Sequence, residues 1–360
     1  MFSNRSSAPA KSSSTGLAPA TRDGLVSPRD AIALGVILLV CLVTGSAFDL
    51  AISNALYDPS NALAVAIEAY GEFPVTALAS VAGISFARAA LAGRAGMTGV
   101  TPGTVALLVL GLGMFAGADA YMTYEALLVL DAPVALIALV NLLLLGLVNY
   151  IVCRVTPDAE RGALIRYALL ALFVVAVDAA LVFGLKEVWE RPRMRLIQSA
   201  WGVAGGGSVD FQPWWQMGCD LRDQLVAEGA AKDDFRSFPS GHASNSACAL
   251  ALLAALPLLN PALGRVRSRL FWSGAAVCAF VSWGRIVIGA HFLSDVTFGF
   301  AITFVAFLVG SILVRRWDRL ASAPGSASTS TPVPAPSLTP TPEGQTPTPE
   351  APNPTPSAQR

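Results

Sequence analysis

The sequence is poor in charged residues and poorer still in histidine. Only 13% of its 360 residues are Asp, Glu, Lys or Arg, against 54% hydrophobic residues, and it contains just two histidines. Several apolar runs reach about 18 residues or more, the length that a helix needs to cross a lipid bilayer. This composition excludes a large soluble enzyme and predicts a polytopic membrane protein.

An excess of charge of one sign and clustered cysteines are also missing. Lys and Arg together number 24, as do Asp and Glu, so the formal net charge is zero and nothing indicates a nucleic-acid partner. Of the five cysteines, only Cys219 falls in a clearly polar loop. The other four, Cys41, Cys153, Cys248 and Cys278, lie in or beside apolar runs. The sequence therefore predicts neither a disulfide framework nor a zinc site.

The apolar segments predict an all-α fold, a bundle of about eight membrane-spanning helices. We expect the spans near residues 31–48, 73–92, 104–123, 132–153, 164–184, 240–258, 269–287 and 292–314. The first run is interpreted as a signal anchor. A cleaved signal peptide is the alternative, but the run from Ala31 lacks a clear small-residue cleavage site.

The distribution of basic residues predicts the orientation, because Lys and Arg near helix ends are retained in the cytoplasm. The connections 49–72 and 119–131 contain acidic residues and no Lys or Arg. Arginines gather instead in the alternate connections and after the last span, at positions 94, 154, 161, 166, 265, 267, 269, 315, 316 and 319. We therefore expect a protein of the inner (cytoplasmic) membrane with both termini cytoplasmic, and with the connections 186–239 and 285–295 facing outward.

Both histidines lie in polar motifs at the ends of apolar runs, a position that favours chemistry over packing. His242 ends the segment Ser237-Phe238-Pro239-Ser240-Gly241-His242, and His291 lies between Arg285 and Asp295. A third polar cluster, residues 186–194, ends the fifth span. Each cluster alone has an ordinary interpretation. The basic residues of 186–194 could snorkel to the interface, and the segment that ends at His242 could be the first turn of a helix. His291 and Asp295 could be a surface pair spaced by four residues.

Together, the three clusters suit a phosphoryl group, because Lys and Arg side chains and the amides of a helix N-terminus offer many donors to its oxygens. We expect His291 to be the nucleophile, with Asp295 holding its other ring nitrogen, and His242 to protonate the leaving oxygen. The expected phosphate ligands are Lys186, Arg193, Ser240, Gly241 and Arg285.

These motifs resemble the signature of the type 2 phosphatidic acid phosphatases. That signature reads Lys, six residues, Arg-Pro; then Pro-Ser-Gly-His; then Ser-Arg, five residues, His, three residues, Asp. The matching positions are Lys186 and Arg193, residues 239–242, and Arg285, His291 and Asp295. The resemblance covers about residues 164–314 and implies a helical bundle, a phosphohistidine intermediate and no metal or other cofactor.

The first and third motifs each depart from the signature. Met194 replaces the Pro of the first motif, and Gly284 replaces the Ser of the third, which removes one possible phosphate donor. Arg191 is followed by Pro but has the wrong spacing from Lys186. Because the geometry depends on spacing, we expect Arg193 to bind the phosphate and Arg191 to be an accessory residue that tolerates substitution by Lys.

The chain then divides into four parts. We expect a disordered cytoplasmic tail at 1–29, N-terminal transmembrane helices at 30–160, a catalytic transmembrane core at 161–320 with the outward loop 186–239, and a disordered Pro/Thr-rich tail at 321–360. In the outward loop, Phe211 and the pair Trp214-Trp215 are interpreted as an interfacial belt or as a lid. Asp178 either steadies Lys186 or forms an interhelical hydrogen bond.

The expected function is hydrolysis of a phosphomonoester or diphosphate of a membrane lipid at the outer membrane–water interface. Undecaprenyl diphosphate, phosphatidic acid, phosphatidylglycerol phosphate and lipid A are candidate substrates. A lipid phosphotransferase with the same site is one alternative. A transporter or a non-enzymatic membrane protein is another, although it has no need of three phosphate motifs.

Overall fold

The computed structural model describes residues 24–92 and 101–321, and all the regular elements in these ranges are helices. Eight helical spans there are long and apolar enough to cross a membrane, which confirms the predicted number. They comprise α2 (Pro28–Leu56), α3 (Ala62–Tyr70) with α4 (Phe73–Ala92), α5 (Pro102–Leu127), α6 (Val134–Val155), α7 (Arg161–Trp189), α10 (Gly241–Ala254) with α11 (Leu256–Leu259), α12 (Arg267–Val287) and α13 (Leu293–Ala321). The chain is a multi-pass, all-α membrane protein.

Helix α2 begins earlier than the hydropathy predicts, because its N-terminus is capped. The Ser27 hydroxyl accepts a hydrogen bond from the amide of Asp30 at 3.1 Å, and Pro28 occupies the first helical position. Leu25 is already buried. The prediction of a disordered tail up to residue 29 is therefore wrong for these last residues, whereas its remainder, 1–23, and the C-terminal tail from 322 onward lie outside the described residues.

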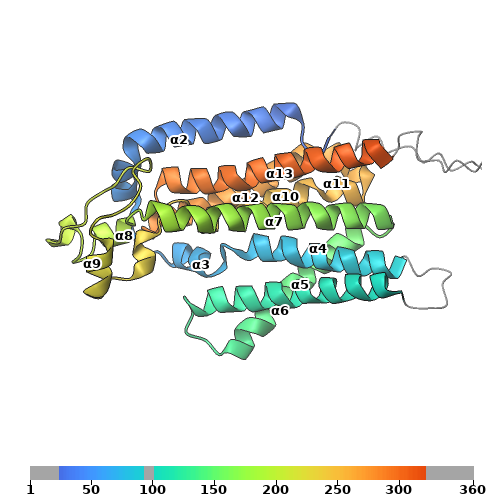
Figure 1. Cartoon of the computed structure of the whole chain (residues 1–360), viewed down its shortest axis with the longest axis horizontal. Coiled ribbons are helices and arrows are strands. Elements are labelled where there is room, and N and C mark those ends of the chain that lie inside the picture. Colours follow the sequence, from blue (N-terminus) through green and yellow to red (C-terminus); the bar gives the residue numbers. More distant parts are fainter. Residues whose placement is uncertain (1–23, 93–100, 322–360) are drawn as a thin grey trace, which may run out of the picture. The chain divides into compact units, whose positions relative to one another are not determined.

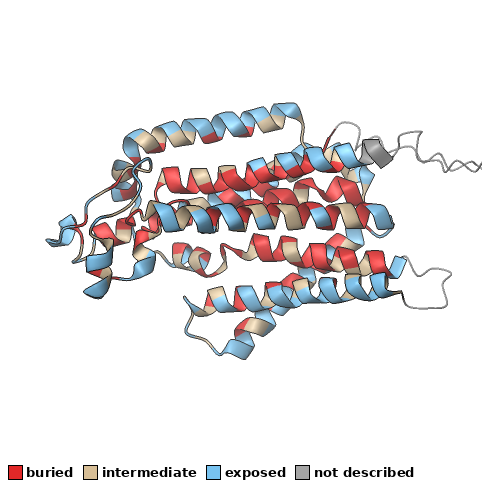
Figure 2. Cartoon of the chain, in the orientation of Figure 1, coloured by how far each residue is buried: buried red, intermediate tan, exposed pale blue. Residues whose placement is uncertain are grey.

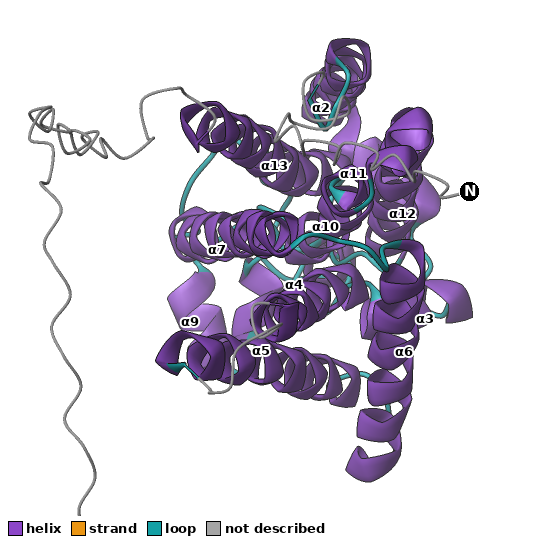
Figure 3. Cartoon of the chain, turned by 90° about the vertical axis from the view of Figure 1, so that its right-hand side faces the viewer, coloured by secondary structure: helices purple, strands orange, loops and turns teal. Residues whose placement is uncertain are grey.

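Helix α10 forms the centre of the bundle. It packs against α4, α7, α12 and α13, which surround it in the end-on view of Figure 3. Figure 2 shows α4 mostly buried, whereas α2, α5 and α6 carry exposed faces. These exposed faces are rich in Leu, Val and Ile, as expected for helices in contact with lipid.

The helices alternate in direction, so that the connections carrying the motifs meet at one end of the bundle, on the left in Figure 1. The long connection after α7 is folded there into a cap. It contains α8 (Met194–Ile197), η1 (Val203–Gly205), α9 (Arg222–Ala227) and η2 (Lys232–Phe235). The cap has a small apolar core of its own that includes Met194, Phe235 and Phe292.

Candidate functional site

A cavity of about 1210 Å³ opens at this end of the bundle, between α3, α4, α5, α7, α10, α12 and the cap. It brings together six of the predicted site residues from distant parts of the chain: Lys186, Arg193, Gly241, His242, Arg285 and His291. The other three predicted residues, Ser240, Asp295 and the accessory Arg191, are fully buried and do not line the cavity.

Ser240 forms the N-cap of α10 and so aims the first turn of this helix at the cavity. Its hydroxyl accepts from the amide of Ala243 at 3.2 Å, and its own amide donates to the Asp295 carbonyl at 3.1 Å. Gly241, rather than Ser240, lines the cavity. The Ser240 hydroxyl is thus engaged as a helix cap and is not turned toward the place of a phosphate.

The cationic side chains of the cavity are paired with acids from separate elements. Arg193 contacts Asp233 of the cap at 2.9 Å, and Arg285 contacts Glu68 of α3 at 3.0 Å. Burial raises the pKa of the Asp233 carboxyl, but the charges of Arg193 and Lys186 outweigh it and hold the pKa below its usual value. The sequence analysis missed these acids: it placed Glu68 in the connection 49–72, whereas the structure has it in the helical span Ala62–Ala92.

Three arginines of the cavity each leave a guanidinium nitrogen without a partner. The Nε atoms of Arg193, Arg236 and Arg285 are buried and make no hydrogen bond to any described residue. A buried donor without an acceptor is destabilising by about 1–3 kcal/mol, so such groups point to a ligand with acceptor oxygens. Within the described ranges no three His, Cys, Asp or Glu side chains are grouped so as to hold a metal ion.

His291 lies in the turn before α13 and is 1% exposed. Its Nδ1 donates to the backbone carbonyl of Ser237 at 2.6 Å, and because a carbonyl only accepts, the other ring nitrogen, Nε2, keeps its lone pair in the neutral ring. Burial first, and then the charges of Arg193, Lys186 and Arg285, hold the pKa of His291 well below its usual value. The ring is therefore a neutral base or nucleophile at physiological pH.

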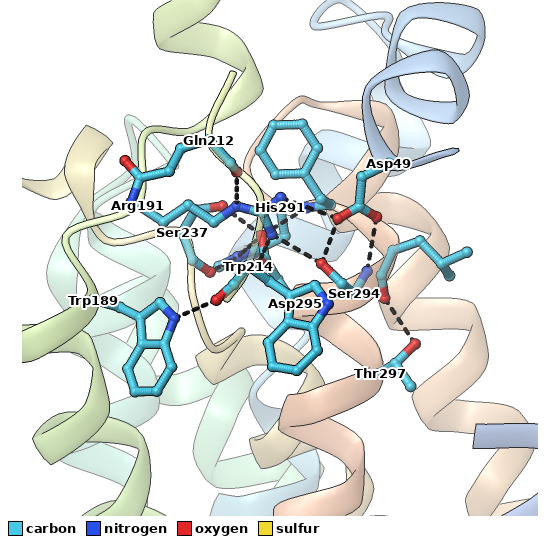
Figure 4. A network of polar contacts seen from close by, with 12 residues as sticks. Asp49, Trp189, Arg191, Gln212, Trp214, Ser237, His291, Ser294, Asp295 and Thr297 are labelled. Carbon is cyan, nitrogen blue, oxygen red and sulfur yellow. Dashed lines mark hydrogen bonds and ion pairs between the residues drawn. The ribbon is translucent and has the colours of Figure 1, made fainter. Parts of the chain in front are cut away.

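The predicted hydrogen bond between His291 and Asp295 is not formed. Their Nδ1 and Oδ2 atoms are 3.9 Å apart, beyond hydrogen-bonding distance. Oδ2 of Asp295 instead accepts from the Ser237 hydroxyl at 2.6 Å and from the Phe292 amide at 2.8 Å (Figure 4). The prediction failed because α13 begins only at Leu293, so His291 precedes the helix and does not share a helical face with Asp295. Asp295 supports the His291 ring indirectly, because it accepts from the Ser237 hydroxyl and the Ser237 carbonyl accepts from the ring.

Arg191 is fully buried and does not line the cavity. Its guanidinium donates to the Gln212 carbonyl at 2.7 Å, to the Ser294 hydroxyl at 2.9 Å, and to the carboxylates of Asp49 and Asp295 (Figure 4). Its carbon Cζ also lies 4.3 Å from the ring centroid of Phe292. Arg191 therefore joins α2, the cap and α13, and the prediction of an accessory residue at the phosphate site does not fit its position.

Contacts also bear on two alternatives left open by the sequence. The carboxylate of Asp178 accepts from the Thr303 hydroxyl at 2.8 Å, which is the interhelical hydrogen bond, while Lys186 donates to the Arg236 carbonyl at 3.0 Å. Trp214 is packed between Phe238 and Phe298 and donates to the Ser46 hydroxyl at 2.8 Å. Trp214 thus belongs to the packed cap, whereas Trp215 is 56% exposed, so for the rest of the loop the belt and the lid both stay predictions.

Replacing Arg191 by Lys should destabilise the fold strongly, contrary to what the spacing alone suggested. One ammonium group cannot reach Asp49 and Asp295 on opposite sides of a guanidinium, so a buried carboxylate loses its partner, at a cost of about 2 kcal/mol or more. Thermal unfolding in detergent measures this loss. Arg222→Lys is the matched control, since its partners Glu190 and Asp223 are partly or largely exposed; equal stability of the two variants would contradict the role assigned to Arg191.

Comparison with known proteins gives two matches. Residues 167–319 match the model of the PAP2 superfamily, and this segment contains all three motifs but none of α2 to α6. Phosphatidylglycerophosphatase B of Bacillus subtilis (strain 168) is 30% identical over 74 residues, which are 20% of this chain and 36% of that protein. The chain thus spans little more than a third of the length of this curated relative. No solved structure matches the chain.

Proposed function

We propose that the chain is a membrane lipid phosphatase whose residues 167–319, which match the PAP2 superfamily model and carry the predicted motifs, form its catalytic part. The observation that carries this proposal is the shape of the cavity. Its polar end holds a neutral buried histidine beside arginines with unpaired Nε groups. From there the same cavity continues between apolar helices.

The apolar part of the cavity is a groove walled by α5 and α7 with α4 beside them. Its lining includes Met114, Gly117 and Ala118 of α5 and Val175, Ala179 and Val182 of α7. Between Lys186 and Val175 the α7 wall rises by about 16 Å, at roughly 1.5 Å per residue. A soluble phosphate ester has no use for such a wall, whereas the chain of a lipid phosphate does.

The reaction follows from the position of each group. Lys186, Arg193, Arg285 and the N-terminal amides of α10 bind the phosphoryl oxygens and stabilise the charge that spreads over them. The Nε2 lone pair of His291 attacks phosphorus as the bond to the lipid oxygen breaks, and His242 protonates that oxygen. Water then hydrolyses the phosphohistidine and returns a proton to His242. The Ser237 carbonyl keeps Nδ1 of His291 protonated throughout.

The substrate is a lipid phosphomonoester or diphosphate on the outer side of the inner membrane. The name of the Bacillus relative makes phosphatidylglycerol phosphate the first compound to test, followed by phosphatidic acid, undecaprenyl diphosphate and lipid A. Transfer of the phosphoryl group to a lipid acceptor in place of water is the second candidate function. Supplying such an acceptor and assaying for a phosphorylated product separates the two.

Substitution of the histidines should separate their roles. His291→Ala should abolish phosphate release from these lipids in the presence of a chelator, because no other group can carry the phosphoryl group. His242→Ala should slow release about a hundredfold, the usual effect of losing a general acid, yet still form phosphoenzyme with an aryl phosphate whose leaving group needs no proton. Phosphate release and trapped phosphoenzyme are both measured. Full activity of His291→Ala would sink the mechanism.

Filling the groove should impair lipid turnover selectively. A leucine at Gly117 projects into the groove, so Gly117→Leu should lower kcat/KM for a long-chain lipid phosphate about tenfold, the equivalent of ~1.4 kcal/mol. A short-chain, water-soluble phosphate should be turned over as by the wild type. Gly113→Leu is the control, since Gly113 is on the same helix, equally open, and does not line the cavity. Equal losses with both substrates would argue against a lipid chain in the groove.

The outward orientation of the site predicts which side of the membrane exposes Cys219. A membrane-impermeant maleimide should label it in intact spheroplasts, under mildly alkaline conditions because burial raises the pKa of this thiol. In a protein whose Cys219 is replaced by Ser, the substitution Ala262→Cys places a cysteine at the opposite end of the bundle. This cysteine should be labelled only after lysis. The reverse pattern would show that the site faces the cytoplasm.

A further inference from the structure

Glu72, which precedes α4, is a cavity residue that the family motifs do not include. It lies outside the matched segment 167–319 and is 6% exposed. Its Oε1 atom is 2.9 Å from Nδ1 of His242. A buried carboxylate so close to the expected general acid either takes part in the chemistry or only stabilises the packing of the site.

The contacts of His242 decide its protonation. Its Nε2 lies 3.0 Å from the backbone carbonyl of Glu68. A carbonyl oxygen carries no proton, so Nε2 must be the donor of this hydrogen bond. If Nδ1 also donates, to the carboxylate of Glu72, then the ring holds two protons and is an imidazolium.

The other contacts of Glu72 show that its carboxylate only accepts. Its Oε2 atom accepts from the amide nitrogen of Asn245 at 2.8 Å and from the hydroxyl of Tyr121. A carboxylate surrounded by three donors is stabilised in its ionised form. The hydrogen bond at Oε1 is therefore completed by a proton on Nδ1 of His242.

We propose that Glu72 is a positioning residue that holds His242 as the imidazolium, whose Nε2–H passes from the Glu68 carbonyl to the leaving oxygen of the lipid. This inference rests on the proposed function. Tyr121 and Asn245 orient the carboxylate in turn, so that α5, α10 and the connection before α4 act on one ring. The N-terminal spans thereby complete a site whose motifs all lie in the C-terminal half.

The proton balance of the reaction is simple in this arrangement. As the bond between phosphorus and the lipid oxygen breaks, the proton on Nε2 moves from the Glu68 carbonyl contact to that oxygen. His242 then keeps only the proton on Nδ1, which Glu72 continues to accept. The water that attacks the phosphohistidine gives one proton back to Nε2, and the free enzyme is restored.

Glu72→Gln tests the proposal, since glutamine keeps the size of the side chain and removes its charge. We expect turnover of a lipid phosphate with an alkyl leaving group to fall about tenfold or more, while turnover of an aryl phosphate, which needs little protonation, changes less than about threefold. Glu125→Gln is the matched control, because this cavity carboxylate of α5 is not among the described partners of His242, which are Glu68 and Glu72, and should leave the ratio of the two rates unchanged.

A double variant excludes a merely structural role. The double variant Glu72→Gln/His242→Ala should be no slower than His242→Ala, since the first change acts only through the histidine.

Equal losses with both substrates, or additive losses in the double variant, would overturn the role of Glu72 while leaving the proposed function intact. Absence of phosphate release by the wild type from every lipid would overturn the proposed function and this inference with it. If Glu72→Gln is not produced as a folded protein, Tyr121→Phe carries the same comparison, because it removes one donor to Glu72. A uniform change of both rates in that variant would equally count against the proposal.

Discussion

Several buried cations share one cavity at the end of the helical bundle, and like charges placed so close together repel one another. The remainder of the site is arranged around that constraint. Arg193 and Arg285 are both buried there, beside Lys186. Their charge is offset by Asp233 of the cap and Glu68 of α3, which contact them. Because each acid occupies only part of its arginine, unpaired donors remain for the phosphoryl oxygens of the proposed substrate.

Buried charge also holds the cap and α2 against the turn before α13, which contains His291. Arg191, with Asp49 of α2 and Asp295 of α13, forms a buried cluster whose members would be destabilising if any were left alone. The cluster fixes the start of α13 and, through Ser237, the ring of His291. A rigid frame of this kind holds His291, the proposed nucleophile, in one tautomer without a hydrogen bond to a carboxylate.

The N-terminal spans provide more than membrane anchorage. Helices α3, α4 and α5 precede the segment that matches the superfamily, yet they contribute Glu68, Glu72 and Tyr121 to the cavity. They also form part of the groove that continues from its polar end. The chemistry we propose therefore depends on contacts between the two halves of the chain, and neither half contains the complete site.

The sequence by itself determined the class of the protein, the number of its spans and the residues of its motifs. Long apolar runs can only be satisfied as helices in a bilayer, and the motif spacing identified His242, His291, Arg193 and Arg285 before any contact was known. Only the tertiary structure decided what each side chain does. It placed Arg191 in a buried ion cluster, gave Nδ1 of His291 to the Ser237 carbonyl, and brought Glu72 to His242 across 170 residues of chain. Spacing predicts which residues share a face of one helix. Contacts between different helices depend on packing and on the neutralisation of buried charge, and they cannot be inferred from a local sequence pattern.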